Sequence, residues 1–271
     1  MLSKLIKYDM KALNHFLIFI HLFLLIISIA GRVFITGHID FNSGEISTIL
    51  FVLAIMLYFI LLIGAAFGTE IIIAVRFYKN IYSDEGYLTN TLPVTRGQIL
   101  LSKIITGSIW YIIDILTVYA CIIILAATPY VIEQVKVHGS EFLLEFGCTE
   151  PGSIQKMIFY FLLITLIGGI SSVIMLYSSI VIGQLFGNHR VLSSVITYFV
   201  LSTLISILSL LFMAVSGNLT APMKAAMDGA TFVPYQYYMN TFSLTLILNI
   251  ITSIVMYGIS YWLMRKKLNL N

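Results

Sequence analysis

Charged residues are scarce in this chain of 271 residues. Asp, Glu, Lys and Arg together make up 10% of it, whereas hydrophobic residues make up 59%. In a soluble domain about a quarter of the residues are charged. The mean hydropathy of +1.00 therefore excludes a soluble domain and indicates an integral membrane protein. We attribute the net charge of +3 to the cations that set the orientation of a membrane protein. We expect no nucleic-acid partner.

Several motifs of catalytic and metal-binding proteins are also missing. The sequence has no Gly-rich loop followed by Lys and Ser or Thr, so it lacks a P-loop for ATP phosphates. It has no His-Glu-x-x-His or Gly-x-Ser-x-Gly motif, and its five histidines are scattered. Cys121 and Cys148 are the two cysteines, too few for a disulfide framework or a metal cluster. We predict that the chain is not an enzyme and binds no cofactor or metal itself.

Six apolar stretches occupy most of the chain. A helix needs about 20 residues to cross a hydrocarbon layer of ~30 Å. Stretches of this length lie at residues 16–35, 47–75, 104–127, 154–183, 191–215 and 241–264. We therefore expect an all-α membrane protein with six transmembrane helices in one domain, residues 1–271.

The first 15 residues have an amphipathic pattern. Leu2, Leu5, Ile6 and Leu13 recur at helical spacing among lysines. Such a helix lies in the membrane interface, where its lysines reach anionic lipid headgroups. We expect an interfacial helix at 1–15, and a solvated leader is the alternative.

The distribution of Lys and Arg predicts the orientation, since these residues are enriched in cytoplasmic segments. With the N-terminus inside, the inner segments contain eleven cations: Lys4, Lys7, Lys11, Arg76, Lys79, Arg96, Lys103, Arg190, Arg265, Lys266 and Lys267. The outer segments contain four: Arg32, Lys136, Lys156 and Lys224. We therefore place both termini in the cytoplasm.

The most polar segment is 76–103, between the second and third spans. Ser83 precedes two carboxylates and a glycine, a combination that favours the start of a short helix. Pro93 ends that helix. Thr95 and Gln98 have the spacing of a capping box that opens the next helix. The segment thus predicts a helix, a break and a second helix on the cytoplasmic side.

Within this segment, EGYLTNTLPVTRGQILLSK resembles the signature of the permease subunits of ABC-2 type ABC transporters. The matching positions are Glu85, Gly86, Leu88, Leu92, Pro93, Thr95, Arg96, Ile99, Leu100 and Lys103. Six spans, an interfacial N-terminal helix and a Pro-containing segment before the last span fit the same family. Tyr87 departs from it, because a small hydroxyl residue is common there.

The resemblance implies a half-transporter in a bacterial cytoplasmic membrane. In this family the loop forms a coupling helix that docks on an ATPase subunit. The positions so implicated here are Asp84, Glu85, Gly86, Leu88, Leu92, Pro93, Thr95 and Arg96. ATP and Mg²⁺ would be held by a dimer of the partner ATPase, and a second permease copy or paralogue would complete an export route. An ordinary charged loop is the alternative reading of the segment.

Polar residues inside the spans are candidates for a pathway or gate. Glu70 and Asp114 are carboxylates within apolar stretches, where an unpaired charge costs ~2.5–3.5 kcal/mol on insertion scales. At ~1.5 Å per residue, Glu70 lies about 9 Å inside Arg76 and Asp114 about 16 Å beyond Lys103, so we expect different depths. Ser202, Ser206 and Asn249 belong to polar stripes, which either line a route or pack helices.

Two other functions remain open from the residues alone. The chain could be a scaffold or sensor that binds a regulatory partner through segment 76–103. It could also be an intramembrane enzyme centred on Asp114, although the missing motifs disfavour this.

Overall fold

The structure, a computed structural model, describes residues 1–38, 45–187, 189–229 and 231–266. All of the secondary structure within these ranges is helical: α1 (Leu2–His38), α2 (Glu45–Tyr82), α3 (Asp84–Thr91), α4 (Arg96–Ala126), α5 (Pro129–Glu145), α6 (Ser153–Gly183), α7 (Arg190–Val215), α8 (Ala221–Met227) and α9 (Pro234–Lys266). Six helices in the described part are long and apolar enough to cross a membrane. The protein is therefore an all-α, multi-pass membrane protein. Residues 39–44 of the loop expected between the first two spans, and Lys267, lie outside the described residues.

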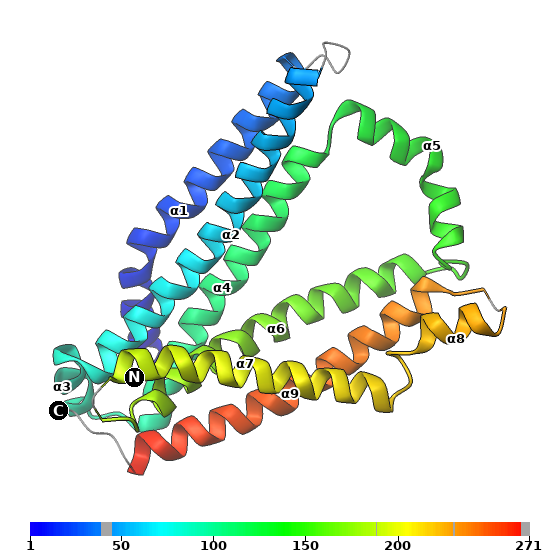
Figure 1. The fold of residues 1–271 in the computed structure, drawn as a ribbon. Coiled ribbons are helices and arrows are strands. Elements are labelled where there is room, and N and C mark those ends of the chain that lie inside the picture. The colour runs from blue at the N-terminus through cyan, green and yellow to red at the C-terminus, as the bar shows by residue number, and fades with distance from the viewer. Residues whose placement is uncertain (39–44, 188, 230, 267–271) are drawn as a thin grey trace.

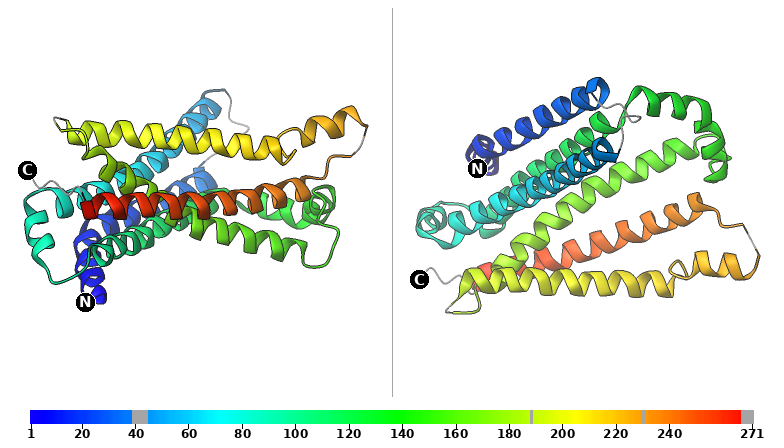
Figure 2. Two further views of the ribbon diagram at one scale, coloured as in Figure 1. Left: turned by 90° about the horizontal axis from the view of Figure 1, so that it is seen from below. Right: turned by 45° about the horizontal axis from the view of Figure 1, so that its top comes forward.

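The long helices form two arms (Figure 1). One arm contains α1, α2 and α4, and the other contains α6, α7 and α9, as the right-hand view of Figure 2 also shows. The arms meet near α3, which caps the lower end of α2 in Figure 1, and they diverge toward α5. Both α1 and α9 have their terminal ends on the α3 side. We call the two extremes of the molecule the α3 end and the α5 end.

Helix boundaries in the first arm differ from the sequence prediction at the α3 end. The predicted interfacial segment 1–15 and the first span are one helix, α1, because no Gly or Pro interrupts the chain before Gly31. Helix α2 continues to Tyr82 and α4 begins at Arg96. Most of the predicted cytoplasmic region 76–103 therefore belongs to the ends of two long helices, and the connection with α3 is shorter than expected.

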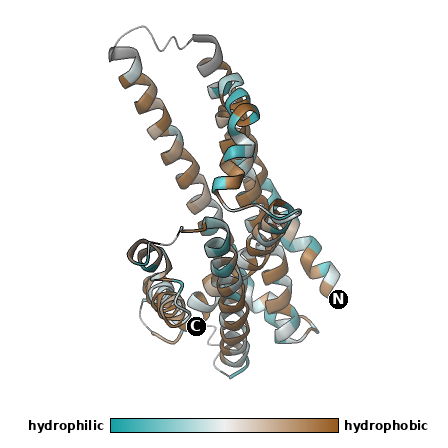
Figure 3. Ribbon diagram, turned by 90° about the vertical axis from the view of Figure 1, so that its right-hand side faces the viewer, coloured by the Kyte–Doolittle hydropathy of each residue, from teal (hydrophilic) through white to brown (hydrophobic). Residues whose placement is uncertain are grey.

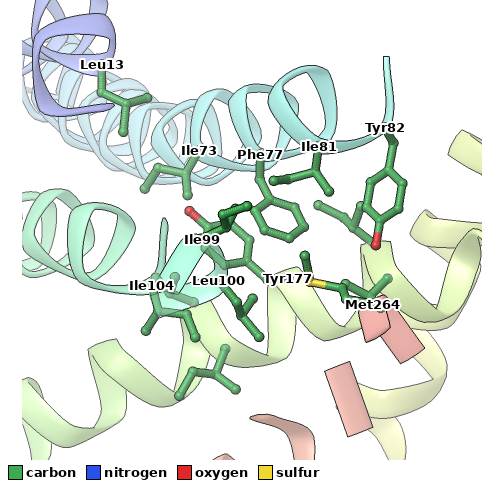
Figure 4. Close-up of a cluster of buried hydrophobic side chains, with 14 of the residues drawn as sticks. Leu13, Ile73, Phe77, Ile81, Tyr82, Ile99, Leu100, Ile104, Tyr177 and Met264 are labelled. Carbon is green, nitrogen blue, oxygen red and sulfur yellow. The ribbon is translucent and has the colours of Figure 1, made fainter. Parts of the chain in front are cut away.

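A buried apolar cluster joins the two arms near the α3 end (Figure 4). Phe77 of α2 stacks on Tyr177 of α6, with the ring centroids 4.0 Å apart. Leu13 of α1, Leu100 of α4 and Met264 of α9 are buried in the same cluster. Close packing of this kind is rigid. The α3 end is therefore the place where a displacement of one helix reaches both arms.

Serine hydroxyls join α6 to α9. Ser260 donates a hydrogen bond to Ser178 (2.8 Å), and Ser178 contacts the carbonyl of Met256 (3.2 Å). Further along, Ser171 donates to the carbonyl of Asn249 (3.0 Å). Hydrocarbon offers no driving force for apolar helix association, so small hydroxyl residues that permit close approach are a typical solution.

Helix α5 connects the arms at their far ends and was not expected, because residues 128–153 were predicted only as an outer segment. Thr128 caps it by accepting from the amide of Val131 (3.2 Å), and Pro129 occupies the first helical position. Its last turn is tied to the second arm, where the amide of Tyr235 donates to the carbonyl of Phe146 (2.9 Å).

Side chains of the long helices are mostly hydrophobic over their length (Figure 3). Many of these apolar side chains are exposed in the isolated chain, among them Phe19, Ile60, Phe159 and Ile254. In water such a surface would aggregate. It is the surface that a bilayer solvates, and the described part of the chain is thus built for a membrane.

Helices α6 and α7 approach closely at Gly183. A Cβ at Gly183 would lie 2.6 Å from the backbone of Ser194, whereas a Cβ at Gly64 meets nothing within 4 Å. Gly183→Ala should separate α6 from α7 and lower the stability by about 1–3 kcal/mol. Gly64→Ala, the matched control, should be neutral or stabilising, because Ala is the better helix former. Thermal unfolding of the two purified variants in mild detergent measures the difference. Equal melting temperatures would contradict the close approach of α6 and α7 at this glycine.

The predicted orientation can be tested with the native cysteines. Cys148 lies in the turn after α5 and is partly exposed, whereas Cys121 is buried. If the termini are cytoplasmic, a membrane-impermeant maleimide added to intact cells should label Cys148. Thr91→Cys, exposed on α3, in a Cys148→Ala background should be labelled only after the membrane is permeabilised. The reverse pattern would invert the topology.

Candidate functional site

Segment 83–95, which we call the elbow, folds back onto the end of α2. Glu85 of α3 lies 3.1 Å from the Arg76 guanidinium and accepts a hydrogen bond from Asn80 (3.1 Å), both on α2. Arg96, at the start of α4, donates to Asn90 of α3. The short helix is therefore fastened at one side to α2 and at the other to α4.

The predicted breaks of the elbow occur where expected. Leu92 is extended (φ −64°, ψ 142°), the conformation that a following proline imposes. Thr95 and Gln98 form both hydrogen bonds of a capping box. Ser83 precedes α3 as predicted, but its hydroxyl donates to the carbonyl of Lys79 (2.5 Å) and makes no cap bond to α3. Ser83 thus closes α2.

The outward face of the elbow combines apolar and polar side chains. Leu88 is 74% exposed and Leu92 is 43% exposed. Asp84, Pro93 and Thr95 are also exposed, Arg96 is partly buried, and Gly86 is buried. Exposed leucine side chains on a protein surface are a typical feature of a protein contact. The elbow therefore presents a small surface with a hydrophobic centre and an acidic edge.

The two intramembrane carboxylates lie close together, contrary to the expectation of different depths. Thr69, next to Glu70 in sequence, donates to Asp114 (2.8 Å). Tyr111, one helical turn before Asp114, donates to Glu70 (3.1 Å). The prediction failed because it measured depth from Arg76 and Lys103 as if these were level.

His21 of α1 is a partner of Asp114 that the sequence did not reveal. Its Nε2 lies 3.0 Å from Asp114 Oδ1, and its Nδ1 lies 2.6 Å from the carbonyl of Leu17. A carbonyl oxygen only accepts, so Nδ1 carries a proton. Nε2 then needs a second proton, its own or that of Asp114, to bond to the carboxyl group. His21 and Asp114 thus form a buried pair that joins α1 to α4.

Both ring nitrogens of His21 are therefore engaged in hydrogen bonds, one with the Leu17 carbonyl and one with Asp114. The Thr69 hydroxyl bonds to Asp114 and not to His21. General-base catalysis needs a histidine nitrogen within reach of the proton that it removes. This arrangement gives no support to the hypothesis of an enzyme centred on Asp114.

The other three candidate residues meet in a second place. Ser202 and Ser206 of α7 and Asn249 of α9 line a cavity of about 170 Å³ beside the serines of α6. The prediction from polar stripes grouped these residues without indicating their partner helix. Glu70 and Asp114 line a different cavity, between α2 and α4. The candidate pathway residues thus form two separate groups.

A buried ion pair joins two helices of the first arm, α1 and α4. Lys103 of α4, predicted as a cation at the cytoplasmic surface, is buried and pairs with Asp9 of α1. The Tyr177 hydroxyl donates to the Lys103 carbonyl (3.3 Å). Asp9 carried no functional prediction, because an acidic residue in a lysine-rich amphipathic segment gives no sign of burial.

Comparisons with protein-family models, curated proteins and solved structures found no match to this chain. Its function therefore has to be inferred from the elbow and from the polar groups between the helices.

A double-mutant cycle tests the His21–Asp114 pair. His21→Phe leaves a buried carboxyl group without its main partner and should cost about 3–5 kcal/mol of stability, whereas the double variant His21→Phe, Asp114→Leu should cost much less. His138 and Glu141 form an exposed pair on α5 with 3.7 Å separation, so His138→Phe should change stability by less than about 1 kcal/mol. Unfolding in mixed micelles measures each value. Additive effects of the two buried substitutions would mean that the pair is not formed.

Proposed function

We propose that this chain is the membrane-spanning permease subunit of an ATP-driven exporter of the ABC-2 type. In this proposal the elbow binds a separate ATPase subunit on the cytoplasmic side of a bacterial cell membrane. ATP and Mg²⁺ are bound by the ATPase dimer. A second permease, identical or paralogous, completes the route through the bilayer.

The observation that carries the proposal is the geometry of the elbow. A short helix that projects an exposed leucine face and is fastened to two membrane helices by Glu85–Arg76 and Arg96–Asn90 can receive a push and pass it on. An ordinary charged loop needs neither the exposed apolar centre nor the two attachments. This geometry agrees with the resemblance seen in the sequence.

The route for such a push is short. Arg96 opens α4, and Lys103, two turns later, pairs with Asp9 of α1. The carbonyl of Lys103 accepts from Tyr177 of α6, which stacks on Phe77 of α2. A movement of α3 would therefore bear on four membrane helices within the apolar cluster. The arms diverge from this point, so a small rotation at the α3 end would be enlarged toward the α5 end.

The alternative of a scaffold or sensor also uses the elbow as a binding surface. It differs in the partner, because a sensor needs no ATPase. The identity and activity of the bound protein therefore separate the two functions.

A substitution at the centre of the elbow tests the proposal. Leu88→Asp should reduce ATPase binding at least about tenfold, because it places a charge in a contact that buries an apolar side chain. Leu144→Asp, at a 63% exposed leucine on α5, is the matched control and should bind as the wild type does.

The measurement is purification of the tagged chain from its native membrane in nanodiscs, with mass spectrometry to count stoichiometric partners. We expect a P-loop protein whose ATP hydrolysis is changed by the wild type and Leu144→Asp, and not by Leu88→Asp. Purification of the chain without an ATPase, or with equal coupling in all three samples, would overturn the proposed function.

A further inference from the structure

A cavity of about 380 Å³ lies between α2 and α4 at the level of the carboxylates. Glu70 and Asp114 are its acidic groups, and Phe67, Tyr111 and Tyr119 contribute aromatic rings. The rest of its lining is aliphatic. Sites for small molecules commonly combine an apolar wall with a few polar groups.

The cavity lies within the first arm, and its tyrosines reach toward the second. Tyr119 has its ring centroid 5.4 Å from that of Phe161 on α6, and Tyr111 interacts with Ser172 on the same helix. Two of the lining residues thus also contact the second arm. A ligand here would lie where a change in the angle between the arms alters the shape of the site.

The charges of the cavity are not balanced. Asp114 is paired with His21, whose Nε2 lies 3.0 Å from its Oδ1. Glu70 accepts from Tyr111, and none of the ion pairs within the described residues includes it. An isolated carboxylate in hydrocarbon is costly and marks a functional group by default. The cavity therefore has one acidic group to be satisfied by a proton or by a bound cation.

We propose that this cavity binds a lipophilic organic cation, with the positive charge at Glu70 and the apolar body against Phe67 and Tyr119. The carboxylate supplies charge recognition, and the aromatic faces attract a cation through their quadrupoles. As the substrate class of the exporter, this assignment rests on the proposed function. The binding itself does not, because it needs only this chain.

The test uses two ions of closely similar size and opposite charge, tetraphenylphosphonium and tetraphenylborate. The full chain in nanodiscs and empty nanodiscs are compared by equilibrium dialysis. We expect saturable binding of one tetraphenylphosphonium per chain and borate uptake no greater than that of empty discs. Phenyltrimethylammonium and its neutral isostere tert-butylbenzene repeat the comparison with a smaller ligand.

Glu70→Gln should weaken cation binding at least about tenfold, because it removes the one uncompensated charge of a site shielded from water. Glu70→Asp keeps the charge and should retain more affinity than Gln. The matched control is Glu133→Gln on the exposed face of α5, which should bind as the wild type does. Tyr119→Leu should weaken binding about threefold or more, whereas Tyr119→Phe, which keeps the ring, should not.

Equal uptake of the two members of each ligand pair by the wild type would overturn the inference, and this result does not depend on the folding of any variant. Unchanged affinity in Glu70→Gln would also overturn it. Cation binding without any associated ATPase would support the cavity and refute the exporter. An elbow-dependent ATPase with no cation binding would support the exporter and refute the substrate class.

Discussion

Hydrocarbon gives a polar side chain no hydrogen-bond partner, and this constraint organises the interior of the protein. Several buried polar groups are satisfied by another helix. Lys103 of α4 pairs with Asp9 of α1, Asp114 of α4 bonds to His21 of α1 and Thr69 of α2, and Ser178 of α6 bonds to Ser260 of α9. Because apolar side chains pack equally well against lipid, these polar contacts specify which helices are neighbours.

The α3 end and the α5 end of the molecule differ in how closely the two arms are packed. Near the α3 end, the Asp9–Lys103 pair joins α1 to α4, and the Phe77–Tyr177 stack joins the two arms within one packed cluster. Farther along, the arms diverge, and α5 connects α4 to α6 (Figure 1). A structure that is stiff at one end and open at the other suits the conversion of a local push into a change of angle. In the proposed exporter the elbow receives the push.

The elbow and the carboxylate cavity are the two regions where the chain departs from pure membrane packing. The elbow exposes leucine in a position that no neighbouring helix covers, and the cavity keeps one carboxylate without a basic partner among the described residues. Both features cost stability in the isolated chain. Selection for a protein partner in the first case, and for a charged ligand in the second, would explain why they are retained.

The sequence determined the fold class and the number of spans, because the length of each apolar run can be compared directly with the thickness of a bilayer. It also determined the helix break at Pro93 and the helix start at Thr95, because these depend on the backbone chemistry of neighbouring residues. Tertiary structure decided the rest of the site. His21 and Asp114 are 93 residues apart, as are Asp9 and Ser102, the neighbour of Lys103. Periodicity within a helix shows which side chains share a face, but it does not show which helix that face meets. The joint level of Glu70 and Asp114, the His21–Asp114 pair and the burial of Lys103 therefore follow from helix packing alone.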